Sequence, residues 1–144
     1  MPDLHVLCLE GDDLALAYPL VRSAARVGPE QWLAFAGELV AGGGGVLGAR
    51  AEGECLYGLA TFRPLDTLRH RRALSVELVV AVELGRRQPV RDVLLRELNT
   101  IALERACPSI LLTIPAGARA DPCCSWEAKG YVQETCMLVR EVGA

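Results

Sequence analysis

The sequence is poor in the side-chain patterns that build metal sites and disulfide frameworks. Its six cysteines include no Cys-x-x-Cys pair, and its only histidines are His5 and His70. Structural zinc sites use close pairs of such ligands, so we predict no metal. A chain of 144 residues can also bury a core without disulfides. We therefore interpret Cys8, Cys55 and Cys136, which lie in apolar alternating runs, as small buried side chains in a reducing compartment, the cytoplasm.

Long apolar runs and an excess of basic charge are also missing. No stretch reaches the roughly 18 apolar residues of a membrane span. The N-terminus, MPDLHVLCLEGDD, lacks the basic residues that open a secretory signal. The net charge of −3 argues against a nucleic-acid-binding protein, because such proteins carry a basic surface. We expect neither a membrane nor a nucleic acid as partner, and we interpret the basic run 69–72 as a solvated loop.

The composition is that of one folded globular domain. Hydrophobic residues make up 51% of the chain and charged residues 23%. The length predicts a single domain over residues 1–144.

Apolar runs with strand or helix periodicity follow one another along the whole chain. The predicted strands are residues 4–9, 46–49, 55–62, 73–84, 109–114 and 131–140. The predicted helices are a segment from residue 14 towards Gly28 that is bent or split at Pro19, and residues 29–41, 89–106 and 121–129. The order is β-α-α-β-β-β-α-β-α-β, with no internal repeat.

Two neighbouring segments have the clearest patterns. Residues 73–84, ALSVELVVAVEL, are nearly continuous in apolar character, which is typical of a central strand covered on both faces. Helix 89–106 places Val90, Leu94, Leu98 and Ile101 on one face. Together with the following strand they predict a parallel crossover. The four glycines 42–45 precede a strand and not a helix, so we interpret them as a flexible link and not as a phosphate-binding loop.

This order of elements resembles the GNAT superfamily of N-acetyltransferases over nearly the whole chain. The hairpin 52–62, EGECLYGLATF, is similar to the family's second and third strands. The strand end VVAVEL, followed by an Arg-rich turn and a long helix, resembles its acetyl-CoA-binding region. Residues 125–131, SWEAKGY, are similar to its late signature of an aromatic residue, Glu, Lys, Gly and an aromatic residue, with one position displaced. The resemblance implies an α/β (α+β) fold with a mixed, mostly antiparallel central sheet flanked by helices.

The resemblance also implies acetyl-CoA as cosubstrate, bound where strand 73–84 meets helix 89–106. In the family, a turn with Gln or Arg and two spaced glycines presents bare amides at a helix N-terminus to the pyrophosphate of coenzyme A. The implied cofactor-binding residues are Val80, Val82, Arg86, Arg87, Gln88, Val90 and Arg91.

The glycines of this turn are missing, since none occurs in residues 86–116. In one register Pro89 and Arg91 take their places, and in the register shifted by one residue Val90 and Asp92 do. Pro89 has no amide hydrogen to donate, whereas the arginines of the turn carry guanidinium groups that bind phosphate. Retained and lost binding of coenzyme A both stay open.

Glu77 and Glu83 are the candidate general bases. They lie six residues apart and project from the same face of the predicted strand. A carboxylate in an apolar strand has to be paired or have a raised pKa, which suits a base near neutral pH. Glu77 is the catalytic candidate, with a structural ion pair as its alternative. We interpret Glu83 as an ion pair or an exposed strand end.

The family's general acid, a Tyr of the late helix, corresponds to Trp126, and an indole cannot act as an acid at ordinary pH. Tyr131 is better explained by packing. Cys123 and Cys124 stand in the first turn of helix 121–129, where a helix N-terminus lowers thiol pKa values. A buried, inert pair is the favoured interpretation, and a reactive thiolate or a redox pair is the alternative.

The sequence thus predicts an acetyl-CoA-dependent N-acetyltransferase acting on a small amine or an amino group. Direct attack of the amine on the thioester would draw on proximity and backbone donors, with Glu77 or water as base. The alternative is a catalytically inactive GNAT-like binding or oligomerisation module, which the missing glycines and Trp126 favour. A homodimer, formed by strand exchange or by edge pairing through the final strand, is a candidate assembly.

Overall fold

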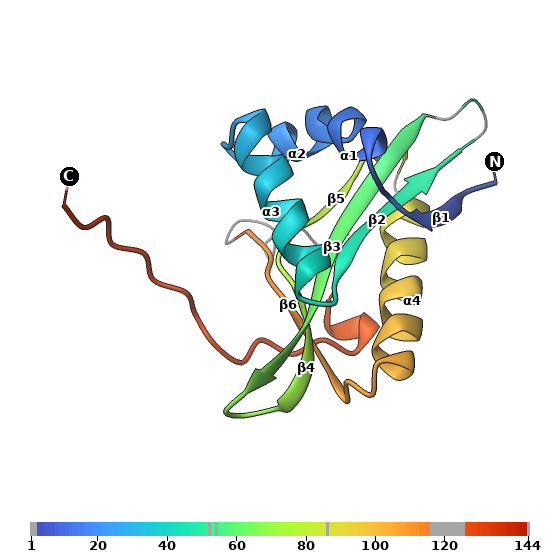
Figure 1. Cartoon of the computed structure of the whole chain (residues 1–144). Helices are drawn as coiled ribbons and strands as arrows, with labels where there is room; N and C mark the ends of the chain where they lie inside the picture. The colour runs from blue at the N-terminus through green and yellow to red at the C-terminus, as the bar shows by residue number, and fades with distance from the viewer. Residues whose placement is uncertain (1–2, 52, 54, 86, 116–125, 144) are drawn as a thin grey trace. The chain divides into compact units, whose positions relative to one another are not determined.

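The structure of the chain is a computed structural model, and it describes residues 3–51, 53, 55–85, 87–115 and 126–143 (Figure 1). Its internal contacts divide the chain into two units, Met1–Ile114 and Pro115–Ala144. The single domain expected from the length stays a prediction.

The first unit is built on a six-stranded sheet (Figure 1). The strands are β1 (His5–Cys8), β2 (Gly45–Arg50), β3 (Leu56–Thr67), β4 (Arg71–Val76), β5 (Val79–Ala81) and β6 (Ser109–Leu112). Their order is β1-β2-β3-β4-β6, with β5 paired to β3. Only β4 and β6 run parallel, and every other pair is antiparallel. This confirms the predicted mixed, mostly antiparallel sheet and the parallel pairing across helix 89–106.

Strand β3 is longer than the sequence pattern predicted, because it continues past residue 62 to Thr67. Its first half pairs with β5 through Gly58, Leu59 and Ala60. Its second half pairs with β4 over residues 63–67. The two partners thus follow one another along the same edge of β3, since β2 occupies the opposite edge.

Four helices flank this sheet: α1 (Asp12–Leu16), α2 (Tyr18–Ala24), α3 (Pro29–Ala41) and α4 (Pro89–Glu104). The helix is split near Pro19, which is one of the two predicted outcomes, and Pro19 lies in the first turn of α2, where its missing amide hydrogen costs no helical hydrogen bond. Trp32 Nε1 donates a hydrogen bond to the carbonyl oxygen of Leu14 at 2.8 Å and so ties α3 to α1. Val40, in the last turn of α3, is exposed.

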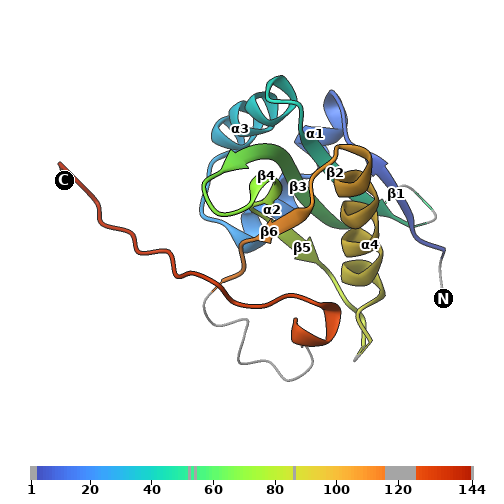
Figure 2. The ribbon, with the colours of Figure 1, turned by 90° about the horizontal axis from the view of Figure 1, so that it is seen from below.

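The helices cover both faces of the sheet (Figure 2). Leu59 belongs to a buried cluster with residues of α1–α3, while a Cβ on the preceding residue, Gly58, would meet Val90 and Leu94 of α4. Since successive strand residues point to opposite faces, α4 covers the face opposite α1–α3. The buried cluster consists of Leu9, Ala17, Val21, Trp32, Ala36, Leu39, Val46, Leu59 and Val80.

Over its described residues 126–143, the second unit has a short 3-10 turn and no strand. Of the helix expected over 121–129, residues 121–125 lie outside the described residues, and Glu127–Lys129 form a single 3-10 turn, η2. Gly130 follows at φ 89°, the left-handed conformation expected of a glycine that ends a helix. The strand expected over 131–140 is wrong: residues 131–143 belong to no strand or helix, and from Val132 onwards they are exposed.

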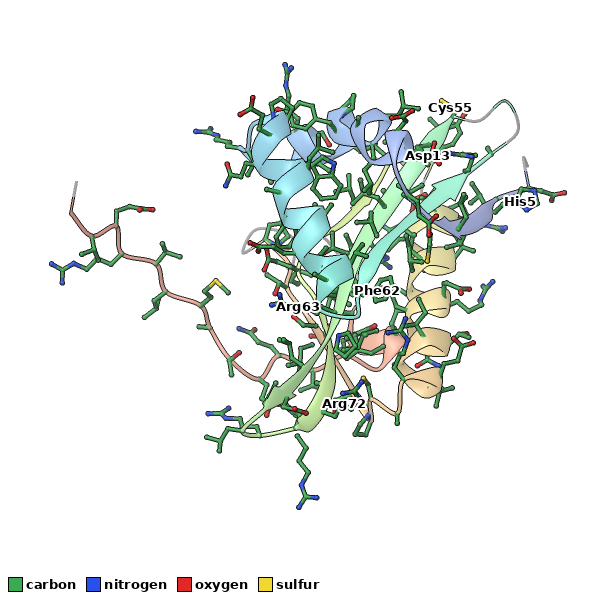
Figure 3. All side chains as sticks on the ribbon, in the orientation of Figure 1. His5, Asp13, Cys55, Phe62, Arg63 and Arg72 are labelled. Atoms are coloured by element: carbon green, nitrogen blue, oxygen red, sulfur yellow. The ribbon has the colours of Figure 1, made fainter. Side chains whose placement is uncertain are left out.

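Three cysteines interpreted as buried are exposed instead. Cys8 ends the edge strand β1, Cys55 begins the return from the β2–β3 turn (Figure 3), and Cys136 lies in the extended segment of the second unit. Cys107, after α4, is the buried one. The alternating pattern of an apolar run does not say which face of an edge strand is covered, so it could not predict whether a cysteine on that strand is buried.

Candidate functional site

A break in the predicted strand 73–84 creates the candidate site. Strand β4 ends at Val76 and pairs with both β3 and β6, whereas β5 begins at Val79 and, within the described residues, pairs with β3 alone. Beyond the paired residues of β4 and β6, a hydrogen bond from Thr113 N–H to Val76 O, at 2.9 Å, continues their pairing up to the break. Among the described residues, β5 has no strand partner on the side away from β3. Within the described residues, β5 and β6 therefore part, and the parting begins at the break.

Thr61 holds this break in place. Its backbone N–H donates to the carbonyl oxygen of Leu78 at 2.9 Å, and its hydroxyl oxygen accepts from Leu78 N–H at 3.1 Å. Thr61 is fully buried, so the pair satisfies both backbone groups of the residue where the strand turns away. Thr61 was not among the predicted site residues, although its hydroxyl is the only polar side chain in the apolar run LATF, residues 59–62.

The residues whose backbone groups face the open side of β5 lie one position away from the predicted ones. Val82 N–H donates to Tyr57 O at 2.7 Å, and the carbonyl of Leu78 accepts from Thr61. Backbone groups alternate in direction along a strand, so those of Val80 also face β3. The expectation that Val80 and Val82 present backbone groups to a ligand is therefore corrected to Val79 and Ala81.

The N-terminus of α4 is occupied by a carboxylate of the chain itself. Glu83 accepts hydrogen bonds from Val90 N–H at 3.0 Å and from Arg91 N–H at 3.1 Å, one on each carboxylate oxygen. Pro89 has no N–H, and Asp92 N–H is bound to Gln88 O at 3.0 Å. The donors of the first helical turn are thus satisfied internally, and a negative charge already lies where a helix attracts anions.

Glu83 is not the exposed strand end of our expectation, and among the described residues its carboxylate binds backbone amides and not a cation. It is half-buried and connects the end of β5 to the start of α4. The sequence signal for this role, an acidic residue shortly before a helix that begins with proline, was present but was not used.

The arginines near the start of α4 differ in their exposure to solvent. Arg87 is exposed and lies next to the helix start, where it can meet an anion. Arg91 is buried, with Nε 4.0 Å from Asp92 Oδ1, so it does not present its charge to solvent. Gln88 is the N-cap residue of α4, and Arg86 lies outside the part of the chain that the structure describes.

Glu77 lies at the break itself and not within a strand. It is exposed, which corrects the expectation of a carboxylate enclosed by apolar residues. Because the strand is interrupted at residues 77–78, Glu77 and Glu83 do not share the face of one continuous strand. Its position still places it one residue from Leu78, at the start of the free β5 edge.

Gly58 positions α4 against this edge. A Cβ at Gly58 would lie 2.6 Å from Val90 Cγ1, 2.8 Å from Val80 O and 3.1 Å from Leu94 Cδ1. The missing side chain lets the first turns of α4 sit directly on β3 and β5. The glycine that we matched to the family's third strand therefore has a structural reason.

The late aromatic signature forms a compact turn in the second unit. The carbonyl oxygen of Trp126 accepts from Lys129 N–H and Tyr131 N–H, each at 3.0 Å. The rings of Trp126 and Tyr131 meet edge-to-face with centroids 5.8 Å apart, as expected for packing. Burial raises the pKa of the Tyr131 hydroxyl above its ordinary value. Cys123 and Cys124 lie outside the described residues.

The site fits one part of coenzyme A better than another. The outward backbone groups of β5 can pair with an extended chain carrying amides, as the pantetheine arm does. The start of α4 does not fit a pyrophosphate while Glu83 holds its donors. The residues described contain no group of three or more His, Cys, Asp or Glu placed to hold a metal ion. No helix among them has the length and apolar character to cross a membrane.

Comparison with known proteins relates the chain to acetyltransferases by structure alone. Neither a family model nor a curated protein sequence matches it. An aminoglycoside N-acetyltransferase in complex with CoA superimposes with a TM-score of 0.79 at 12% identity, covering 99% of this chain and 97% of the other. An aminoglycoside antibiotic 6'-N-acetyltransferase from Acinetobacter baumannii gives 0.79 at 11% identity, covering 98% and 100%.

A ribosomal-protein-alanine N-acetyltransferase from Brucella melitensis gives a TM-score of 0.71 at 21% identity, covering 96% of this chain and 100% of the other. At these identities the agreement concerns the fold. The mixed sheet, the parting of its strands and the superpositions agree with the resemblance drawn from the sequence, and the chain has the fold of the GNAT superfamily of N-acetyltransferases.

Proposed function

We propose that the chain is an acetyl-CoA-dependent N-acetyltransferase acting on a small amine or an amino group. The observation that carries the proposal is the free outer edge of β5, opened at residues 77–78 beside the start of α4. An acyl thioester whose amide arm pairs with this edge would bring its carbonyl carbon near the break.

In this proposal the amine nitrogen attacks the thioester carbonyl carbon, the carbon–sulfur bond breaks, and coenzyme A leaves as a thiolate that takes up a proton. Backbone N–H groups of Val79 and Ala81 are the donors for the oxygen on which negative charge develops. Glu77, exposed at the break, accepts the proton of the amine directly or through water. Holding both reactants in place supplies much of the rate enhancement.

Glu83 sets a condition on this function. Two anions cannot share the α4 amides at low cost, so the pyrophosphate has to displace the carboxylate or bind beside it through Arg87. We therefore expect weak binding by the wild type. Replacing Glu83 with Gln removes the competing charge and should tighten binding of acetyl-CoA.

Thermal unfolding with millimolar acetyl-CoA tests the binding step. A ligand that binds the native state raises the melting temperature, by an amount that corresponds to about 2.7 kcal/mol at a hundredfold excess over Kd. We expect a small shift for the wild type and a larger one for Glu83→Gln. Glu104→Gln, which makes the same charge change at the other end of α4, is the control and should behave as the wild type.

Turnover on a panel of small amines and peptide amino groups tests the chemistry. Glu77→Gln should lower kcat by roughly 10²–10⁴ if Glu77 is the base, with the acetyl-CoA shift unchanged. Normal turnover of Glu77→Gln would assign the base to water.

A second candidate function is a binding module without transferase activity. The occupied donors of α4 and the absent N–H of Pro89 favour it, because they remove the anion site that the family's glycines provide. If acetyl-CoA shifts neither the wild type nor Glu83→Gln, this candidate replaces the transferase. A shift without turnover on any amine would leave a carrier or sensor of coenzyme A.

A further inference from the structure

The candidate site treats the two ends of coenzyme A unequally. Strand β5 and helix α4 are neighbours joined by a short turn (Figure 2). Along β5 the outward backbone groups of Val79 and Ala81 can pair with an extended chain that carries amides, as a pantetheine arm does. Past the end of β5, the amides at the start of α4 are already bound to Glu83. One end of the site is therefore ready for its part of the ligand, and the other end is filled.

The charges around the start of α4 do not suit a diphosphate. Glu83 brings one carboxylate to the amides of Val90 and Arg91, and Asp92 adds a second in the first helical turn. Arg91 is buried with its Nε 4.0 Å from Asp92 Oδ1, so its charge lies against a carboxylate of the chain itself. Arg87 is exposed next to the helix start. A diphosphate would thus meet two carboxylates, with one solvent-facing arginine among the described residues of this turn to attract it.

The surface that follows β5 is apolar on both sides of Glu83. Val82 has 42% of its surface accessible and Leu84 has 85%, although both side chains are large and hydrophobic. Apolar side chains at the end of the free edge suit the branched hydrocarbon part of a pantetheine arm, because contact removes apolar surface of both from water. These side chains have no hydrogen bond to give to a phosphate.

We propose that the preferred donor of this chain is an acyl thioester on a pantetheine arm that carries no diphosphate. Such an arm ends in a hydroxyl group or in a single phosphate, and it occurs either free or joined through that phosphate to a protein. Arg87 can meet a single phosphate without the amides of α4. The inference rests on the proposed transferase function and changes only the donor, with acetyl-CoA as a weaker one.

The reaction is balanced as it is for acetyl-CoA. The amine nitrogen forms a bond to the acyl carbon, and the bond between that carbon and the sulfur breaks. The arm leaves as a thiolate that takes up a proton, while the amine gives one up to Glu77 or to water. The diphosphate takes no part in these steps, so a donor without it loses no chemistry.

Binding of three small ligands tests the preference without an acceptor amine. The probes are pantetheine, 4'-phosphopantetheine and coenzyme A, measured by titration calorimetry and by the shift of the melting temperature. We expect the Kd of coenzyme A to exceed that of 4'-phosphopantetheine by about tenfold or more, because the diphosphate has to displace Glu83 or lie beside it. Coenzyme A binding as tightly as 4'-phosphopantetheine, or more tightly, would overturn the inference and leave the proposed function standing. If none of the three binds, both fail.

A charge variant tests the cause of the preference. In Glu83→Gln the ratio of the two Kd values, coenzyme A over 4'-phosphopantetheine, should fall by about tenfold. The ratio compares two ligands on one variant, so a general change in the fold cancels. Glu104→Gln makes the same charge change at the far end of α4 and should keep the wild-type ratio. A ratio that does not change in Glu83→Gln would show that Glu83 does not select the donor.

A backbone variant tests the shared part of the site. Ala81→Pro removes an outward N–H of β5 and should abolish binding of all three ligands, whereas Ala81→Ser keeps the N–H and should bind them. Both variants have to unfold cooperatively near the wild-type temperature. If Ala81→Pro binds all three as the wild type does, the arm does not use β5, and the proposed function fails together with the inference.

Turnover separates the two sources of such an arm. With the amine panel, S-acetyl-4'-phosphopantetheine is compared with the same acetylated arm on a serine of an acyl carrier protein. A higher kcat/KM for the protein-borne arm would assign the donor to a partner protein, and an equal or lower value would assign it to a free molecule. In either case acetyl-CoA should have a kcat/KM about tenfold lower than the better of the two, and a higher value for acetyl-CoA would overturn the inference.

Discussion

The carboxylate of Glu83 caps helix α4, which begins at Pro89, with 3.0 Å between Glu83 Oε1 and Val90 N. Its second oxygen takes the next amide, that of Arg91. Residues 84–88 lie between the acid and the helix start at Pro89, so the cap spans the turn between β5 and α4. In a turn with glycines, the amides at the helix start would be open to a ligand. Here the amides of Val90 and Arg91 bind Glu83 and hold the turn instead.

Removing this cap should destabilise the fold. Glu83→Ala leaves two amides of α4 without their acceptor, and we expect the free energy of unfolding to fall by about 1–2 kcal/mol. Urea denaturation followed by circular dichroism measures the loss. Glu104→Ala, near the C-terminus of the same helix, should cost less than about 0.5 kcal/mol. Equal losses would show that the cap contributes nothing specific.

We expect the hydroxyl group of Thr61 to contribute more to the free energy of unfolding than its methyl group does. Thr61→Val keeps the shape but leaves Leu78 N–H buried without its acceptor, which costs about 1–3 kcal/mol. Thr61→Ser keeps the hydroxyl and loses only a methyl group, so it should cost about 1 kcal/mol. Thermal and urea unfolding of both variants compare the two effects, and a Val variant as stable as the Ser variant would contradict this role.

Two glycines should respond in opposite directions to alanine. At Gly58 the new Cβ meets Val90 Cγ1 at 2.6 Å and Val80 O at 2.8 Å, so α4 has to move, at a cost of about 1–3 kcal/mol. Gly37, in the interior of α3, has no heavy atom within 4 Å of the new Cβ. Gly37→Ala should therefore stabilise the protein by about 0.5–1 kcal/mol. A tolerated Gly58→Ala would refute the close approach of α4.

The described thiols should differ in their accessibility to alkylation. Cys55 and Cys136 are exposed and should react within the folded protein, whereas Cys107 should react only on unfolding. Cys8 is exposed as a residue, but partial burial of its sulfur, together with Glu10 and Glu97, raises the pKa of its thiol. Less of it is thiolate at neutral pH, so its reaction should need a higher pH. Mass spectrometry after timed alkylation, with Cys8→Ser as control, measures each site.

The contact between Tyr131 and Trp126 should be visible as a pH dependence. Burial raises the pKa of Tyr131 above its ordinary value of 10.0, so the folded state keeps a proton that the unfolded chain loses. The contribution to stability is complete below pH 10.0 and is lost as the pH rises through the folded value. Ultraviolet titration should show a phenolate step above pH 10.0 that is absent in Tyr131→Phe. A difference spectrum that titrates at or below that value would contradict the burial.

The sequence was most informative where a periodic pattern coincided with an element that buries one face. Helix 89–106 begins at Pro89 as predicted and ends two residues early, because proline and the spacing of Val90, Leu94 and Leu98 are local signals. The single strand 73–84 failed for the opposite reason. Its apolar continuity says that both faces are covered, but not that the strand, which pairs with β3 on both sides of the break, loses its pairing with β6 at residues 77–78.

By itself the sequence determined the order of helices and strands as far as residue 114, apart from the split of strand 73–84, and the late turn around Gly130, since these depend on spacing, proline and glycine within short segments. The mixed character of the sheet was implied by the family resemblance. The tertiary structure alone decided that Thr61 holds the break, that Glu83 fills the start of α4 and that Glu77 is exposed. Each of these depends on a hydrogen bond or on burial between residues far apart along the chain or across a turn. Apolar periodicity reports which side of an element is covered, and it carries no information about which distant polar group satisfies a given amide.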